Sequence, residues 1–141
     1  MLVALRPEFV AKHWREIGSE FGRAMPPVGI NSGFSINVLL ERILSGEVTV
    51  WLVTDAEGVV KGFIATIVTV DRCTDTKSLL IYILVGDLTI ELWRDGSETL
   101  REYAKSRGCV FINGFCKNRG ELVILKSLGA DIEYRLVTWE V

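Results

Sequence analysis

Histidine and cysteine are scarce in this sequence of 141 residues, which contains one histidine and three cysteines. His13 alone cannot build a multi-histidine metal site. Cys73, Cys109 and Cys116 include no closely spaced pair, so their spacing argues against a zinc site and against a disulfide framework. We therefore expect no metal, and we expect a reducing, cytoplasmic setting.

The sequence also lacks an excess of charge of one sign and a long hydrophobic run. Its net charge of -2 gives no basic footprint for nucleic acid and no polybasic anchor for a membrane. The richest apolar runs, at residues 59–70 and 78–85, are too short to span a bilayer. Residues 1–5 have no basic segment before them and are followed by Arg6 and Pro7, which is not the pattern of a secretory signal. The length predicts a single domain over residues 1–141.

The first third of the chain predicts a short strand and two amphipathic helices. Residues 2–5 are apolar, and Pro7 is favoured at the first position of a helix. Ser35 can cap a second helix that ends at Gly46, with an irregular loop over residues 25–33 between the two. Apolar residues recur at helical spacing in both segments: Val10, Trp14, Ile17 and Phe21 in the first, and Ile36, Leu39, Leu40, Ile43 and Leu44 in the second.

The remainder of the chain predicts a mixed sheet. Residues 48–54 and 59–70 flank the turn at residues 55–58 and form a hairpin, and residues 78–85 add a third antiparallel strand. Asp87 is a suitable N-cap for a long helix that runs to Arg107, with a weak point at Gly96. A parallel strand at residues 110–115, a helix at 121–127 and a strand at 134–141 complete a C-terminal βαβαβ half. The fold class is therefore α/β (α+β), with a mixed central sheet behind an N-terminal antiparallel meander and its two helices.

The closing segment resembles the C-terminal half of the GNAT (GCN5-related N-acetyltransferase) superfamily. Members commonly carry a helix that ends in Ala-x-x-x-Gly, then an apolar strand, an Asn, and a short helix before Gly-Phe or Gly-Ala. This chain is similar to that pattern in the same order, with Ala104 to Gly108 at the helix end, residues 110–112 as the strand, Asn118, and Gly129 with Ala130 after the short helix. The chain is also similar, in size and in its degenerate cofactor loop, to divergent GNAT-like proteins that tailed phages encode.

The resemblance implies a site for acetyl-CoA, whose pantetheine lies where the strand before the long helix splays from its parallel neighbour. By family position, Leu84, Val85, Leu88 and Asn118 would contact the cofactor. The pyrophosphate requires Gln or Arg, two residues, a Gly, one residue, and then Gly or Ala at the helix N-terminus. Those positions correspond to Leu88, Glu91 and Trp93, none of which fits. A shifted alignment would use residues 94–96, but it would shorten the helix to about three turns.

The catalytic tyrosine that many members carry corresponds to Leu125 here, which has no proton to donate. Catalysis would have to recruit another acid and a base. The candidate acids are Tyr82, Tyr103 and Tyr134, and the candidate bases are Glu47, Asp87 and Glu121. Each has a structural alternative as a packed aromatic, a helix cap or a helix-terminal charge. We interpret Cys116 as an inert thiol, because no base is evident for it.

Two hypotheses follow from these residues. In the first, the chain is a GNAT-fold domain with a degenerate acyl-CoA site that serves as a binding or structural module, with a virion as one setting. In the second, it is an acetyl-CoA-dependent N-acetyltransferase that acts on a small amine. A protein partner and a homo-oligomer both remain open. An exposed patch built from Trp51, Trp93 or Trp139 would be a partner site.

Overall fold

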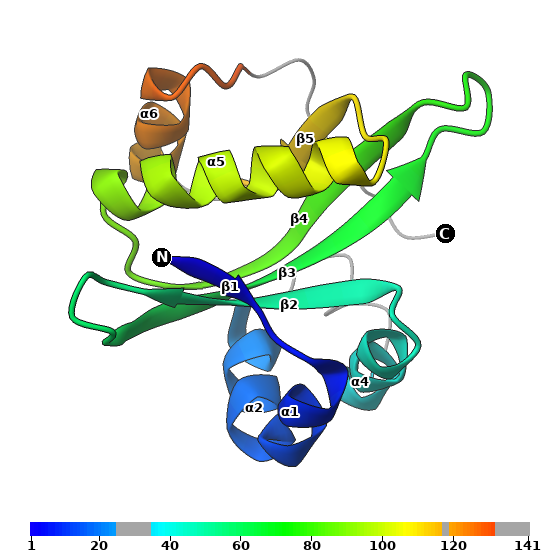
Figure 1. Ribbon diagram of the computed structural model, residues 1–141, viewed down its shortest axis with the longest axis vertical. Coiled ribbons are helices and arrows are strands. Elements are labelled where there is room, and N and C mark those ends of the chain that lie inside the picture. Colours follow the sequence, from blue (N-terminus) through cyan, green and yellow to red (C-terminus); the bar gives the residue numbers. More distant parts are fainter. Residues whose placement is uncertain (25–34, 117–118, 132–141) are drawn as a thin grey trace.

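A computed structural model describes residues 1–24, 35–116 and 119–131 of the chain. A central sheet has α1, α2 and α4 on one face and α5 and α6 on the other (Figure 1). The elements in chain order are β1 (Leu2–Ala4), α1 (Pro7–Lys12), α2 (Trp14–Ala24), α4 (Ile36–Leu44), β2 (Val48–Thr54), β3 (Val60–Val70), β4 (Lys77–Gly86), α5 (Ile90–Ser106), β5 (Phe111–Gly114) and α6 (Arg119–Ser127).

The sheet is mixed, as the sequence predicts. Its strand order is β1-β2-β3-β4-β5, and the first four strands pair in antiparallel fashion. β5 pairs with β4 in parallel, because α5 carries the chain back across the sheet before β5 begins. The predicted strand at residues 134–141 and the predicted loop at residues 25–33 lie outside the described residues.

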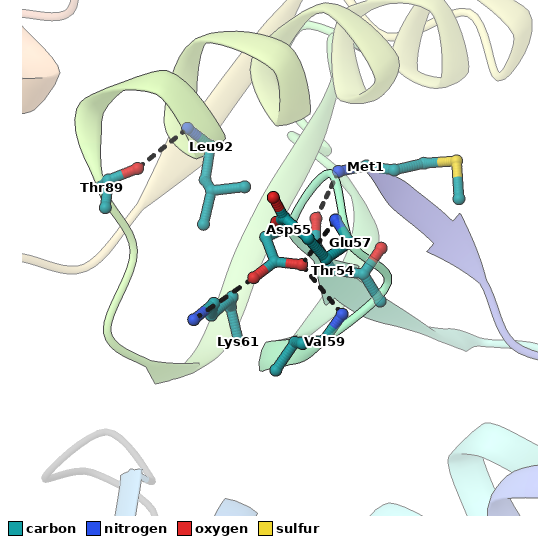
Figure 2. Close-up of polar contacts among 8 residues, drawn as sticks. All are labelled: Met1, Thr54, Asp55, Glu57, Val59, Lys61, Thr89 and Leu92. Carbon is teal, nitrogen blue, oxygen red and sulfur yellow. Dashed lines mark hydrogen bonds and ion pairs between the residues drawn. The ribbon is translucent and has the colours of Figure 1, made fainter.

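The β2–β3 hairpin has the predicted turn, and Asp55 organises it (Figure 2). One oxygen of its carboxylate, Oδ1, accepts the N–H groups of Glu57 at 3.0 Å and Val59 at 2.9 Å, and Lys61 lies 3.4 Å from the other oxygen. Gly58 supplies the left-handed backbone at φ 81°. The Val59 amide, helped by Lys61, lowers the pKa of Asp55 below its ordinary value of 3.8.

The N-terminal helices confirm the predicted apolar face but not its continuity. The prediction of one helix through the first stripe is wrong, because the chain breaks at His13 into α1 and α2. The His13 N–H is shared between the carbonyl groups of Phe9 and Val10, a local tightening, and the Phe9 ring lies 4.5 Å from the His13 ring. The stripe still faces the sheet. Its buried members from both helix predictions are Val10, Ile17, Phe21, Leu39 and Ile43.

The prediction of α4 is confirmed at both ends. The Ser35 hydroxyl oxygen accepts the Asn37 N–H at 3.3 Å, and Gly46 follows the helix with φ 83°. The helix packs on the same face of the sheet as α1 and α2. This face of the molecule is therefore closed by an apolar layer.

The long helix α5 is uninterrupted, so the weak point predicted at Gly96 causes no break. The prediction of Asp87 as its N-cap is wrong, because Thr89 caps the helix and Asp87 is exposed in the connector. Leu88 lies in the core between them, which keeps the chain extended for two residues beyond Asp87. The buried residues of α5 are Trp93, Gly96, Leu100 and Ala104.

Candidate functional site

The first candidate site is the open edge of β4. β5 pairs only with residues Ser78 to Ile81, so within the described residues the segment from Tyr82 to Gly86 has no partner on that side. Five strand residues leave an edge about 17 Å long. The pairing of the two parallel strands therefore ends ahead of Leu84 and Val85, the residues for which the resemblance implies contact with the pantetheine.

A β-bulge marks the point where β4 and β5 part. Ala65 of β3 pairs with Ile83, whereas the next residue, Thr66, pairs with Ile81, so Tyr82 is the extra residue on β4. Tyr82 and Ile83 consequently both pack toward the layer of α1, α2 and α4. The Tyr82 ring also meets the Phe115 ring edge to face, with centroids 6.5 Å apart. Tyr82, a candidate acid, is thus a half-buried aromatic at the closed end of the edge.

The far end of β4 is held tightly against β3 by a pair of glycines. Gly62 lies opposite Gly86, and a Cβ added at Gly62 would sit 2.0 Å from the Val85 carbonyl oxygen. Gly86 has φ 118°, a left-handed conformation that disfavours other residues. The backbones of β3 and β4 are therefore closer here than they could be if either glycine were replaced by a residue with a side chain.

The N-terminus of α5 carries the side chains that sequence reasoning placed at the pyrophosphate positions. Leu88 is 9% exposed and Trp93 is 8% exposed, and both belong to the core cluster beneath α5. Glu91 is exposed in the first turn, where its charge complements the helix dipole. The Thr89 hydroxyl oxygen accepts the Leu92 N–H at 3.4 Å (Figure 2). A diphosphate here would meet a carboxylate and a neighbouring apolar core.

The other family-position residues lie on different elements. Leu84 and Val85 are half-buried on opposite faces of the unpaired half of β4, with Leu84 in contact with the cluster beneath α5 and Val85 with the cluster beneath α1 and α2. Glu121 lies in α6, and Leu125 of the same helix packs against the cluster beneath α5. Asn118 and Tyr134 lie outside the described residues.

A second candidate site is a half-open pocket of about 300 Å³ beside the C-terminal turn of α5. It is lined by two of the residues that the sequence offers as catalytic candidates, the base Glu47 and the acid Tyr103. The fold brings them together at the opposite end of β4 from the acyl-CoA site. The lining residues are Ser45, Gly46, Glu47, Thr49, Thr66, Ile67, Val68, Leu79, Tyr103 and Arg107.

Polar side chains in and beneath this pocket are connected by specific contacts. The hydroxyl groups of Thr49 and Tyr103 lie 3.0 Å apart, and the buried Trp51 indole N–H donates to the Thr66 hydroxyl oxygen at 2.9 Å. Arg107 lies over the Tyr103 ring, 5.9 Å from its centroid. Sequence reasoning missed Thr49, Thr66 and Arg107. The signal that could have found the threonines is a hydroxyl at an inward position of an otherwise apolar strand.

The described residues also bear on the predictions about metals, membranes and tryptophans. No group of three or more His, Cys, Asp or Glu side chains in these residues could hold a metal ion. None of the described helices is both long enough and apolar enough to cross a membrane. Trp51 and Trp93 are buried and so form no exposed patch, while Trp139 lies outside the described residues.

Solved structures of acetyltransferases match this architecture over the full length of the chain. An aminoglycoside acetyltransferase from an uncultured soil metagenomic sample matches with a TM-score of 0.72 and 17% identity, over 100% of this chain and 97% of that one. An aminoglycoside N-acetyltransferase in complex with CoA matches with a TM-score of 0.69 and 13% identity, over 100% and 98% of the two chains. A ribosomal-protein-alanine N-acetyltransferase from Brucella melitensis matches with a TM-score of 0.68 and 10% identity, over 100% and 99%.

These likenesses define the class of fold. The chain has the GNAT fold, with the mixed sheet and the helical layers that the resemblance implied. No protein-family model matches the chain, and no curated protein matches it in sequence. At identities of 10% to 17% the likeness establishes the architecture and leaves the chemistry to be argued from the site.

Proposed function

We propose that this chain is a GNAT-fold binding module whose acyl-CoA site is degenerate. The observation that carries the proposal is the burial of Leu88 and Trp93 in the core at the N-terminus of α5. Small residues at that helix end let phosphate oxygens approach the backbone N–H groups, whereas this chain has large apolar side chains there that are committed to the core. Glu91 adds a negative charge that repels a diphosphate.

The alternative function is transfer of an acetyl group from acetyl-CoA to a small amine. Two observations favour it: the open edge of β4 beyond Ile81, and the full-length likeness to acetyltransferases, one of them in complex with CoA. In this case the main chain around Leu84 and Val85 would bind the pantetheine. Tyr82, Glu121 and Tyr134 would remain the candidates for proton transfer.

Titration calorimetry with acetyl-CoA separates the two functions. The binding-module proposal expects no saturable heat. A micromolar dissociation constant, which corresponds to about -8 kcal/mol, would overturn the proposal and favour the transferase. The variant Glu91→Gly gives a matched test, because removal of the carboxylate should strengthen binding only if the pyrophosphate really docks at this helix end.

For the binding module we propose a protein partner. The similarity in size and in the altered loop to GNAT-like proteins of tailed phages makes a virion one setting for such a module. Mass spectrometry of proteins cross-linked to the tagged chain in its native cells, or of purified particles, tests this part. Recovery of acetyl-CoA-dependent acetylated amines with no associated protein would contradict it.

A further inference from the structure

We propose that the pocket beside the C-terminal turn of α5 binds a small molecule through a carboxylate or phosphate group, at a site separate from the acyl-CoA position. The pocket includes Leu79, near the start of β4, whereas the acyl-CoA position involves Leu84 near its end. Five residues of strand separate the two by about 17 Å. Binding at one site therefore does not require the other.

The floor of the pocket presents hydroxyl donors from the sheet. Thr49 and Thr66 face each other in register on β2 and β3, on the same face as Trp51 and the core beneath α5. Thr66 is 1% exposed, and its oxygen already accepts the Trp51 indole N–H. Thr66 is too deeply buried to touch a ligand, so it holds the Trp51 indole beneath the pocket. Thr49 and Tyr103 use one proton between their two hydroxyl groups, which leaves the second to be donated.

The rim of the pocket carries a net positive charge. Arg107 is exposed, and it takes part in none of the ion pairs between described residues. The Tyr103 ring holds its guanidinium beside the pocket. The only carboxylate among the lining residues, Glu47, is bonded to Arg42 at 2.9 Å. Arg42, Glu47 and Arg107 together therefore carry one net positive charge.

Three of the four carbonyl groups in the last turn of α5 already accept N–H groups of described residues, which leaves only that of Ser106 unpaired among them. The Tyr103 and Ala104 carbonyl oxygens accept the Arg107 N–H, and the Lys105 carbonyl oxygen accepts the Gly108 N–H. The pocket thus offers more donors than acceptors, and a guanidinium with two parallel N–H groups suits an oxyanion. A volume of about 300 Å³ is at the lower end for small-molecule sites, which suits a small organic acid or phosphate.

The test uses the full chain labelled with ¹⁵N, and it follows the Trp51 indole signal, which Trp51→Phe identifies by its loss. Inorganic phosphate and sodium propionate are titrated separately at constant ionic strength, with sodium chloride as the blank. The Trp51 signal should shift saturably with at least one probe, with a dissociation constant of about 1 mM or tighter. The probe that saturates identifies the ligand as a phosphate or a carboxylate.

Substitutions on α5 and at the rim of the pocket test whether charge at the rim controls the affinity for the anion. Arg107→Gln should weaken binding about tenfold, whereas Arg101→Gln, which removes an exposed arginine paired with Glu98 on the same helix, should leave it unchanged. Glu47→Gln should strengthen binding, because it removes the negative charge at the rim. Weaker binding in Glu47→Gln, or a saturable shift with methylammonium chloride in place of the anions, would overturn the proposal.

The same spectra distinguish failure of the pocket proposal from failure of the proposed function. Acetyl-CoA binding at the open edge of β4 would move the backbone signals of Leu84 and Val85, neither of which lines the pocket. If neither phosphate nor propionate shifts the Trp51 signal, the pocket proposal fails, whatever the result with acetyl-CoA. A shift at Leu84 and Val85 with acetyl-CoA overturns the degenerate-site proposal and leaves the pocket unaffected.

Discussion

Replacement of Trp93 by alanine tests whether the blocked helix end is part of the core. The indole is 8% exposed and packs in the cluster beneath α5 that also includes Leu2, Trp51 and Leu88. Truncation of a buried tryptophan costs about 3–5 kcal/mol, because the transfer free energy is lost and a cavity remains. That loss is a large fraction of the roughly 5–15 kcal/mol that stabilises a domain.

The expected shift in melting temperature follows from the length of the chain. Unfolding entropy of about 2.1 cal/mol/K per residue gives about 0.3 kcal/mol/K for 141 residues. Trp93→Ala should therefore lower the melting temperature by about 10–17 °C in differential scanning calorimetry. Arg94→Ala is the matched control, since Arg94 is the exposed neighbour and its loss should change stability by less than about 0.5 kcal/mol.

A small effect would refute the reasoning. If Trp93→Ala lowered the melting temperature by less than about 3 °C, equivalent to about 1 kcal/mol, the indole would not be part of the core. It would instead lie on the surface, over an open site for the pyrophosphate. Tight binding of acetyl-CoA by that variant would strengthen the same conclusion. If the large loss is observed, the fold needs the side chain that stands where the family pattern has a small residue.

Two other substitutions test a buried hydrogen bond of β3 and the turn of the β2–β3 hairpin. Thr66→Val should destabilise the protein by about 1–3 kcal/mol in urea titration, because it leaves the Trp51 indole N–H buried without an acceptor; an unchanged midpoint would mean that this hydrogen bond is not formed. Asp55→Ala should lower the melting temperature at pH 7, because a lowered folded-state pKa means that ionised Asp55 stabilises the native state. This contribution is present above the unfolded pKa of about 3.9 and is lost as the pH falls through the folded pKa, so a difference between the proteins that persists at pH 2 would contradict it.

Most of the architecture could be predicted from local patterns in the sequence. The β2–β3 hairpin is specified by the β-branched runs and by Asp55 and Gly58, and these residues act within a few positions of one another. The start of α5 could not be predicted this way. Asp87 and Thr89 are both good caps, and the choice between them depends on burial of Leu88 against residues distant in sequence. The break at His13 also leaves the apolar stripe unchanged, so periodicity alone does not reveal it.

The candidate sites were less predictable than the fold. The altered pyrophosphate positions could be located by counting along α5, because a helix has a fixed spacing. The pocket could not, since Thr49, Thr66 and Arg107 come from two strands and the end of a helix. Only the strand register and the crossing of α5 over the sheet bring them together. The sequence offers Glu47 and Tyr103 as candidates for chemistry at the acyl-CoA site, but the fold places them in the pocket, away from the open edge of β4.

The contact between Gly62 and Gly86 limits what the open edge of β4 can accommodate. With backbone against backbone, β4 has no slack to shift toward β3 at that end. An occupant of the open edge would therefore lie along a strand that cannot move away from it, and selection for new ligands should leave the glycine pair untouched.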